Sequence, residues 1–149
     1  MTARLLDLWH EATGPYRKYA DFSGRARRRE YFLFIALQWL VIAALITLHS
    51  VATGGAPLPR PESGWRGGFA GQLTAAAMAL FVLATLVPWL ALSTRRLHDR
   101  GYRGWVMARW FLPYLGLLFM LWDLLRPGDK GDNAFGPDPR GGMYDDWFE

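Results

Sequence analysis

A charged segment separates two of the most apolar stretches of this chain. Residues 95–105, RRLHDRGYRGW, contain four arginines, one histidine and one aspartate. A pair such as His98 and Asp99 occurs in metal-dependent hydrolases, where histidines and carboxylates converge on one metal ion. Such a site needs further ligands, and the only other histidines of the sequence are His10 and His49. The sequence therefore predicts no catalytic, metal or cofactor site, and Asp99 is interpreted as an ion-pair partner of nearby arginines.

Three uncharged runs lie around this segment. Residues 31–50 and 67–94 carry no charge, and residues 110–122 form a third run of 13. About 20 apolar residues are needed to cross a hydrocarbon core of ~30 Å, because a helix rises 1.5 Å per residue. The first two runs are long enough, and a soluble protein of this size has no reason to bury 28 consecutive uncharged residues. The sequence predicts an all-α integral membrane protein.

The third run is too short by itself. Extended to residues 104–125 it has 22 residues, since the long side chain of Arg109 can reach the headgroups. Arg109 and Asp123 are fourteen residues apart, roughly 21 Å along a helix, so we expect them at opposite interfaces and not paired. Tryptophans favour such interfaces, and the run contains or borders Trp105, Trp110 and Trp122. We predict a third span, with a re-entrant or interfacial segment as the alternative.

The predicted fold is a bundle of three transmembrane helices at about residues 31–50, 69–94 and 104–125. Residues 3–13 have apolar side chains on one helical face, which predicts an amphipathic helix that lies in the membrane interface or packs on the rest of the protein. Residues 126–149 are rich in Gly and Pro and predict an irregular tail. The long polar segment before the first run argues against a cleaved signal peptide.

Lysine and arginine are unevenly distributed among the flanking segments. Seven precede residue 31, two lie between the first and second runs, four lie in residues 95–105, and three follow the third run. Cytoplasmic loops of membrane proteins are enriched in these residues. We therefore predict a cytoplasmic N-terminus and a cytoplasmic 95–105 loop. With three spans, the C-terminus would lie outside.

Two basic segments enter the membrane from the same predicted side. Ion pairs between them, such as Glu30 with Arg96 and Asp99 with Arg25, would fix how the first two spans dock. Arginines outnumber carboxylates here, so we expect the surplus to bind anionic lipid headgroups, at ~1 kcal/mol per basic residue. The resulting juxtamembrane ion-pair and lipid-binding motif comprises Gly24, Arg25, Arg28, Arg29, Glu30, Arg95, Arg96, His98, Asp99, Gly104 and Trp105.

The tail contains a short segment with several possible oxygen ligands. Their spacing does not follow the alternation of a calcium-binding loop. We predict instead a glycine-rich turn from which Phe135 packs back on the bundle, formed by Gly131, Asn133, Gly136 and Pro137.

Three motifs in this chain resemble those of a known family. Residues 22–32, FSGRARRREYF, resemble the opening FxGRxxRxE[FY]W of the DUF805 family, the YhaH/YhaI-like small bacterial inner-membrane proteins of unknown function. Residues 95–105 resemble its RRLHDxGxSGW loop, and residues 128–139 resemble its closing GxxGxNx[YF]GxxP. Arg103 and Phe32 depart from the Ser and Trp of these motifs. The resemblance implies one membrane domain over residues 1–149 in the bacterial cytoplasmic membrane, and it implies no reaction.

The sequence favours a non-catalytic interaction or scaffold protein whose partners are anionic membrane lipids. A homo-oligomer or a second membrane protein would be a further partner of this kind. The alternative is a subunit of an oligomeric transporter or channel, and an enzyme acting on lipid headgroups comes third. A nucleic-acid role is not expected, because the basic residues lie close to the bilayer instead of on a folded domain.

Overall fold

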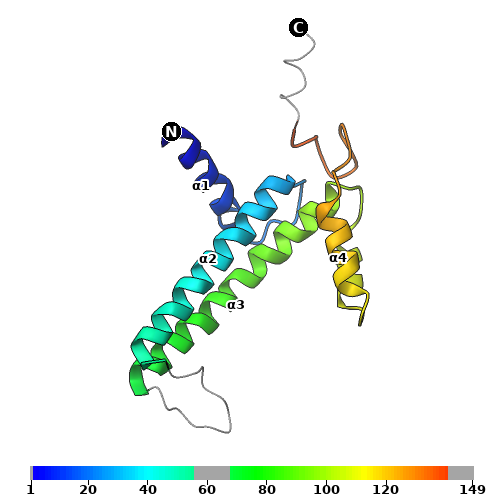
Figure 1. The fold of residues 1–149 in the computed structure, drawn as a ribbon. Coiled ribbons are helices and arrows are strands. Elements are labelled where there is room, and N and C mark those ends of the chain that lie inside the picture. Colours follow the sequence, from blue (N-terminus) through cyan, green and yellow to red (C-terminus); the bar gives the residue numbers. More distant parts are fainter. Residues whose placement is uncertain (1, 56–67, 141–149) are drawn as a thin grey trace. The chain divides into compact units, whose positions relative to one another are not determined.

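The computed structural model describes residues 2–55 and 68–140, and the regular structure within them is helical (Figure 1). The only β-type pairing in these two ranges is an isolated bridge between Asn133 and Gly136. The elements follow in the order α1 (Thr2–Arg17), α2 (Arg28–Thr53), α3 (Gly68–His98), the 3-10 helix η1 (Gly104–Phe111) and α4 (Gly116–Leu125).

The chain divides into two compact units. One unit, Ile35–Leu86, contains most of α2 and the first part of α3. The other consists of Met1–Phe34 and Val87–Glu149, so among described residues it holds α1, the start of α2, the end of α3, η1, α4 and the tail to Arg140. We call the polar part of this second unit, residues 24–30, 95–105 and 126–140, the cap.

Helices α2 and α3 are both long and apolar enough to cross a membrane. In each of them only 17% of the most apolar stretch is buried inside the protein. The central helix of a soluble protein would be mostly buried, so these apolar faces require an apolar solvent. Within their unit the two helices are joined by a buried contact of 2.7 Å between His49 Nδ1 and Thr74 Oγ1. The predicted spans at 31–50 and 69–94 lie within these helices.

The end of α3 is closed by a capping turn. The Tyr102 N–H donates to the Leu97 carbonyl and the Gly101 N–H donates to the His98 carbonyl, both within 3.1 Å. This is the Schellman arrangement, and it requires a residue with positive φ, which Gly101 supplies at +70°. Arg95, Arg96 and His98 occupy the last turn, where cationic groups interact favourably with the helix dipole.

Helix α1 is longer than predicted. It continues through Gly14 and Pro15 to Arg17, whereas the sequence predicts an end at residue 13. Packing explains the difference, because Pro15 is fully buried and the Tyr16 ring lies 5.5 Å from the Phe34 ring of α2. The first turns of α1 are different: Trp9 and Leu5 are more than half exposed. Only the last part of the predicted amphipathic helix therefore packs on the protein.

The prediction of a third transmembrane helix at 104–125 is wrong. The run is broken between η1 and α4, where Pro113 has no N–H to donate and Tyr114 has a positive φ of 66°. The two halves fold back on each other closely, since a Cβ added to Gly116 would lie 1.9 Å from the Trp110 carbonyl oxygen. The run is a short helical hairpin, and α4 has only 10 residues.

The prediction that the tail and the N-terminal segment lie on opposite sides of the membrane is wrong for the described part of the tail. Tail carbonyls of Asp129 and Gly131 accept hydrogen bonds of 2.6 Å from Arg25, which precedes α2. The Asp129 N–H donates to the Asp99 carbonyl at 2.7 Å. Two crossings, by α2 and α3, would place the described tail and the residues before α2 on one side of a membrane.

This topology predicts a specific labelling pattern for single cysteines. The sequence has no native cysteine, so one can be introduced at Ser23, at Tyr102, at Asp132, or at position 63 between α2 and α3. An impermeant thiol reagent is added to sealed vesicles of one orientation. If it labels the first three positions, it should leave position 63 unlabelled, and in vesicles of the other orientation the pattern should be reversed. Labelling of positions 63 and 132 from the same side would restore a three-span topology.

Candidate functional site

The centre of the cap is a buried carboxylate between two buried arginines. Asp99 Oδ1 accepts a hydrogen bond of 3.0 Å from Arg25 Nε, and Asp99 Oδ2 accepts one of 2.5 Å from Arg96 Nη1. At most 5% of any of the three side chains is exposed. Burial raises the pKa of the Asp99 carboxyl above its ordinary value, and the two guanidinium groups counteract that rise. The pair Asp99–Arg25 was predicted, and the structure contains it.

The two arginines also bind the backbone of the tail. Arg25 donates to the Asp129 and Gly131 carbonyls, and Arg96 donates to the Arg126 carbonyl and, at 3.4 Å, to that of Leu124. A guanidinium carries five donors in a fixed fork, so it can bind a carboxylate and carbonyls together. One carboxylate and two arginines thus join three segments that are distant in the sequence.

Gly128 lies directly against the Asp99 carboxylate. A Cβ added at this glycine would be 1.7 Å from Asp99 Oδ2, far inside contact distance. Any larger residue would have to displace either the carboxylate or the tail. The sequence singles out the glycine motif of the tail, but it does not identify Asp99 as the group that requires this glycine.

His98 and Asp99 have different partners. His98 Nδ1 lies 3.2 Å from the Gly24 carbonyl, to which it must donate, and its ring stacks on Phe135 with centroids 4.0 Å apart. The His98 carbonyl accepts a hydrogen bond of 2.9 Å from Asn133 Nδ2. Gly24 itself has a φ of +76°, a conformation that side chains rarely adopt. His98 therefore connects the opening motif to the tail turn, and Phe135 packs back as predicted.

The tail turn is closed by its own hydrogen bonds. Asn133 and Gly136 exchange backbone bonds of 3.0 and 3.1 Å, and the Gly131 N–H donates to Asp138 Oδ2. Burial raises the pKa of Asp138, but hydrogen bonds from Arg140 and from the Gly131 N–H lower it to about 2. Asp138 is therefore ionised at neutral pH and compensates the charge of Arg140.

The predicted pair Glu30–Arg96 is not formed. Glu30 instead faces Arg95, with Oε1 and Nη1 3.8 Å apart. Neighbouring residues of a helix point about 100° apart, so Arg95 and Arg96 reach different carboxylates. Among the other predicted residues, Arg29 binds Glu11 of α1 at 2.9 Å, and Gly104 packs against Thr94. Trp105 is 74% exposed.

A second buried carboxylate, Asp123, was not predicted as a site residue. Its side chain is completely buried and accepts hydrogen bonds from Arg100 at 2.7 Å, from Trp110 Nε1 at 2.8 Å and from two nitrogens of Arg109. The expectation that Arg109 and Asp123 lie too far apart to pair is wrong, because the run between them folds back. Pro113 and Gly116 at the centre of the run were the available signal.

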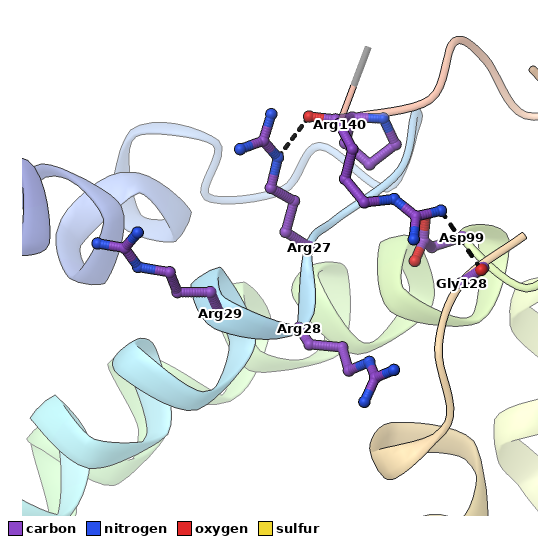
Figure 2. A pocket seen from close by; sticks show the side chains of 7 residues that line it. Arg27, Arg28, Arg29, Asp99, Gly128 and Arg140 are labelled. Carbon is purple, nitrogen blue, oxygen red and sulfur yellow. Dashed lines mark hydrogen bonds between the residues drawn. The ribbon is translucent and has the colours of Figure 1, made fainter. Parts of the chain in front are cut away.

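A basic pocket opens beside Asp99 (Figure 2). Its volume is about 210 Å³, room for a phosphate-sized group, and its lining consists of Arg27, Arg28, Arg29, Asp99, Gly128, Pro139 and Arg140. Figure 2 shows Arg28 and Arg29 extending in opposite directions from the start of α2. The Arg27 and Arg28 side chains donate to neutral carbonyls, those of Pro139 and Leu125. Among the residues that the structure describes, Arg27 and Arg28 have no carboxylate partner, whereas Asp99, Arg29 and Arg140 have partners of opposite sign.

We expect Gly128→Ala to destabilise the protein strongly, because the new methyl group collides with Asp99. Displacing a buried ion-pair partner costs about 3 kcal/mol or more. The matched control is Gly14→Ala in α1, where an added Cβ meets only Glu30 Oε1 at 3.9 Å and helix propensity favours Ala. Thermal unfolding of the purified protein in detergent compares the two. Equal stability of both variants would contradict the close packing of tail and carboxylate.

Asp123→Asn should also destabilise the protein by about 3 kcal/mol, because it leaves Arg100 and Arg109 without their shared carboxylate. Asp7→Asn is the control, since Asp7 is an exposed residue of α1. Replacing Arg109 by Gln in the Asp123→Asn background should recover part of the loss, because one uncompensated charge is then removed. A double-mutant cycle by thermal unfolding measures this coupling, and strict additivity would refute it.

The comparisons with known proteins agree with two long apolar helices that could cross a membrane. The family model "Protein of unknown function (DUF805)" matches residues 19–137. The chain is 32% identical over 125 residues to the inner membrane protein YhaH of Escherichia coli K12, covering 83% of this chain and 91% of the relative. It is 33% identical over 126 residues to the inner membrane protein YhaI of the same strain, covering 85% and 92%. No solved structure matches significantly. This helical membrane protein therefore belongs to the DUF805 family.

Proposed function

We propose that this protein is a non-catalytic membrane scaffold whose cap binds the phosphate of anionic lipid headgroups. The observation that carries the proposal is the basic pocket, where the described partners of Arg27 and Arg28 are neutral carbonyls. Arg27 directly precedes α2 and Arg28 is its first residue, so both lie next to the point where the apolar run begins. A headgroup phosphate at the membrane surface would therefore meet two guanidinium groups, and arginine suits phosphate geometry.

The orientation of the protein is part of this proposal. With two crossing helices, fifteen of the 17 lysines and arginines lie on the cap side, and Arg60 and Arg66 are the two others. Under the positive-inside rule this distribution supports a cytoplasmic cap. The inner leaflet of a bacterial cytoplasmic membrane offers anionic headgroups to such a surface.

A non-catalytic role is supported by the partners of the residues that looked most chemical. His98 uses Nδ1 to bind the Gly24 carbonyl, and Asp99 uses both oxygens to bind arginines. Both side chains thereby hold the cap together. A transporter or channel subunit remains the second class considered from the sequence, but the described contacts of α2 and α3 offer it no specific observation beyond the buried His49–Thr74 pair.

The proposal predicts selective loss of lipid binding when the pocket loses its charge. In Arg27→Gln with Arg28→Gln, binding of phosphatidylglycerol to the purified protein should weaken about thirtyfold, at ~1 kcal/mol per arginine. Native mass spectrometry with a lipid titration measures the dissociation constant, with phosphatidylcholine as the neutral reference.

The matched control is Arg4→Gln with Arg103→Gln, which removes the same charge from exposed positions outside the pocket. Its loss should stay below about threefold, because solvent screens these charges. The conservative variant Arg27→Lys with Arg28→Lys should retain most of the binding. Equal losses of affinity in the pocket variant and in the control would show that lipid binding depends on overall charge and not on the pocket. Unchanged binding in the pocket variant would refute the proposal.

A further inference from the structure

The hairpin of η1 and α4 has a base and a tip within its unit. At the base, Arg100 donates to Asp123 and to the Trp122 carbonyl, so the end of α4 lies beside the end of α3. Figure 1 shows these two helix ends next to each other. The tip is the turn at Pro113 and Tyr114 between η1 and α4.

The hairpin contacts α3 at a point before the cap. Trp110 packs on Trp89 of α3, with ring centroids 6.5 Å apart. Trp89 precedes His98 by nine residues, so this contact lies about 13 Å from the end of α3. Trp89 also belongs to the stretch of α3 that contains no charge. The hairpin therefore reaches from the polar cap to the uncharged part of α3.

The outer surface of the hairpin is apolar. Residues 110–122 carry no charge, and the two charged residues that border them, Arg109 and Asp123, bind each other. The large apolar side chains that remain exposed include Phe111 at 76%, Leu117 and Leu118 at 62% each, and Leu115 at 51%. Several large apolar side chains exposed on so short a segment are unfavourable in water and indicate contact with a membrane or another protein.

The length of the hairpin and its contact with α3 decide whether a membrane or another protein covers this apolar surface. Helix α4 has 10 residues and is about 15 Å long, which is half of a hydrocarbon core of ~30 Å. The hairpin also contacts the uncharged part of a helix that is long and apolar enough to cross a membrane. Lipid chains fit both observations, whereas a protein partner would need neither the length nor this contact.

We infer that the η1–α4 hairpin is a re-entrant wedge that occupies only the leaflet on the cap side, with its surface against the acyl chains. The buried Asp123 at its base binds Arg109 of the hairpin and Arg100 of the loop after α3. The hairpin's own two charged residues therefore pair with each other, and the surplus positive charge stays at the end nearest the cap. This inference does not depend on headgroup binding in the basic pocket.

Single cysteines carrying an environment-sensitive fluorophore test the wedge in reconstituted vesicles. The label is placed at Tyr114 or at Leu118, both exposed on the hairpin, and at Arg103 or Asp132 as cap controls. Emission at 114 and 118 should be blue-shifted and quenched by lipids brominated in the middle of the acyl chain, with little quenching by iodide. The controls should show the reverse pattern, and thermal unfolding identifies any labelled variant that has lost its fold.

Two results would overturn the wedge. Strong iodide quenching at both 114 and 118 would place the hairpin in water or at its surface. Labelling of the cysteine at 114 by an impermeant thiol reagent from the side of position 63 would show a complete crossing. Neither result would affect the headgroup proposal, which is tested separately with the Arg27 and Arg28 variants.

Discussion

The arrangement of the cap depends on keeping the Asp99 carboxylate ionised where it is almost fully removed from water. Transfer of a carboxylate out of water costs several kcal/mol even after the protein has relaxed. Burial raises the pKa of Asp99, which is the physical sign of this cost. Arg25 and Arg96 offset it by binding one oxygen each. Loss of either arginine would leave one buried carboxylate oxygen without its hydrogen-bond donor.

The same two arginines determine which segments surround Asp99. Each guanidinium has more donors than the carboxylate can accept, and the remaining N–H groups need partners because both side chains are buried. Backbone carbonyls of residues 124–131 accept from both Nη atoms of Arg25 and from Nη2 of Arg96. This part of the chain also contributes Gly128, whose missing side chain gives the carboxylate its space. A lysine at either position would bind as a point charge with fewer, differently directed donors. The opening motif, the 95–105 loop and the tail motif are thus three parts of one interaction.

The sequence predicts correctly those features that depend only on the length and charge of successive segments. The two long spans follow from uncharged runs of sufficient length, and the pairing of Asp99 with Arg25 follows from two basic segments on one side of the membrane. Prediction from the sequence fails where the chain reverses direction. The expected distance between Arg109 and Asp123 assumed a continuous helix, but Pro113 and the close approach at Gly116 fold the run into a hairpin. That error also separated the tail from the N-terminal segment, because the run was counted as a third crossing helix. The contact of Gly128 with Asp99 depends on this reversal, so no local pattern could reveal it.

The two buried carboxylates serve different parts of the unit. Asp99 lies in the cap and joins segments that precede α2, end α3 and follow α4, whereas Asp123 joins the two halves of the hairpin to the loop after α3. They share no arginine: Arg25 and Arg96 bind one, and Arg100 and Arg109 bind the other. Arg96 nevertheless donates to carbonyls at the end of α4, directly after Asp123. A substitution of either carboxylate is therefore expected to disturb first the contacts of its own two arginines. Its effect on the other carboxylate would pass through the short stretch of backbone at residues 124–126.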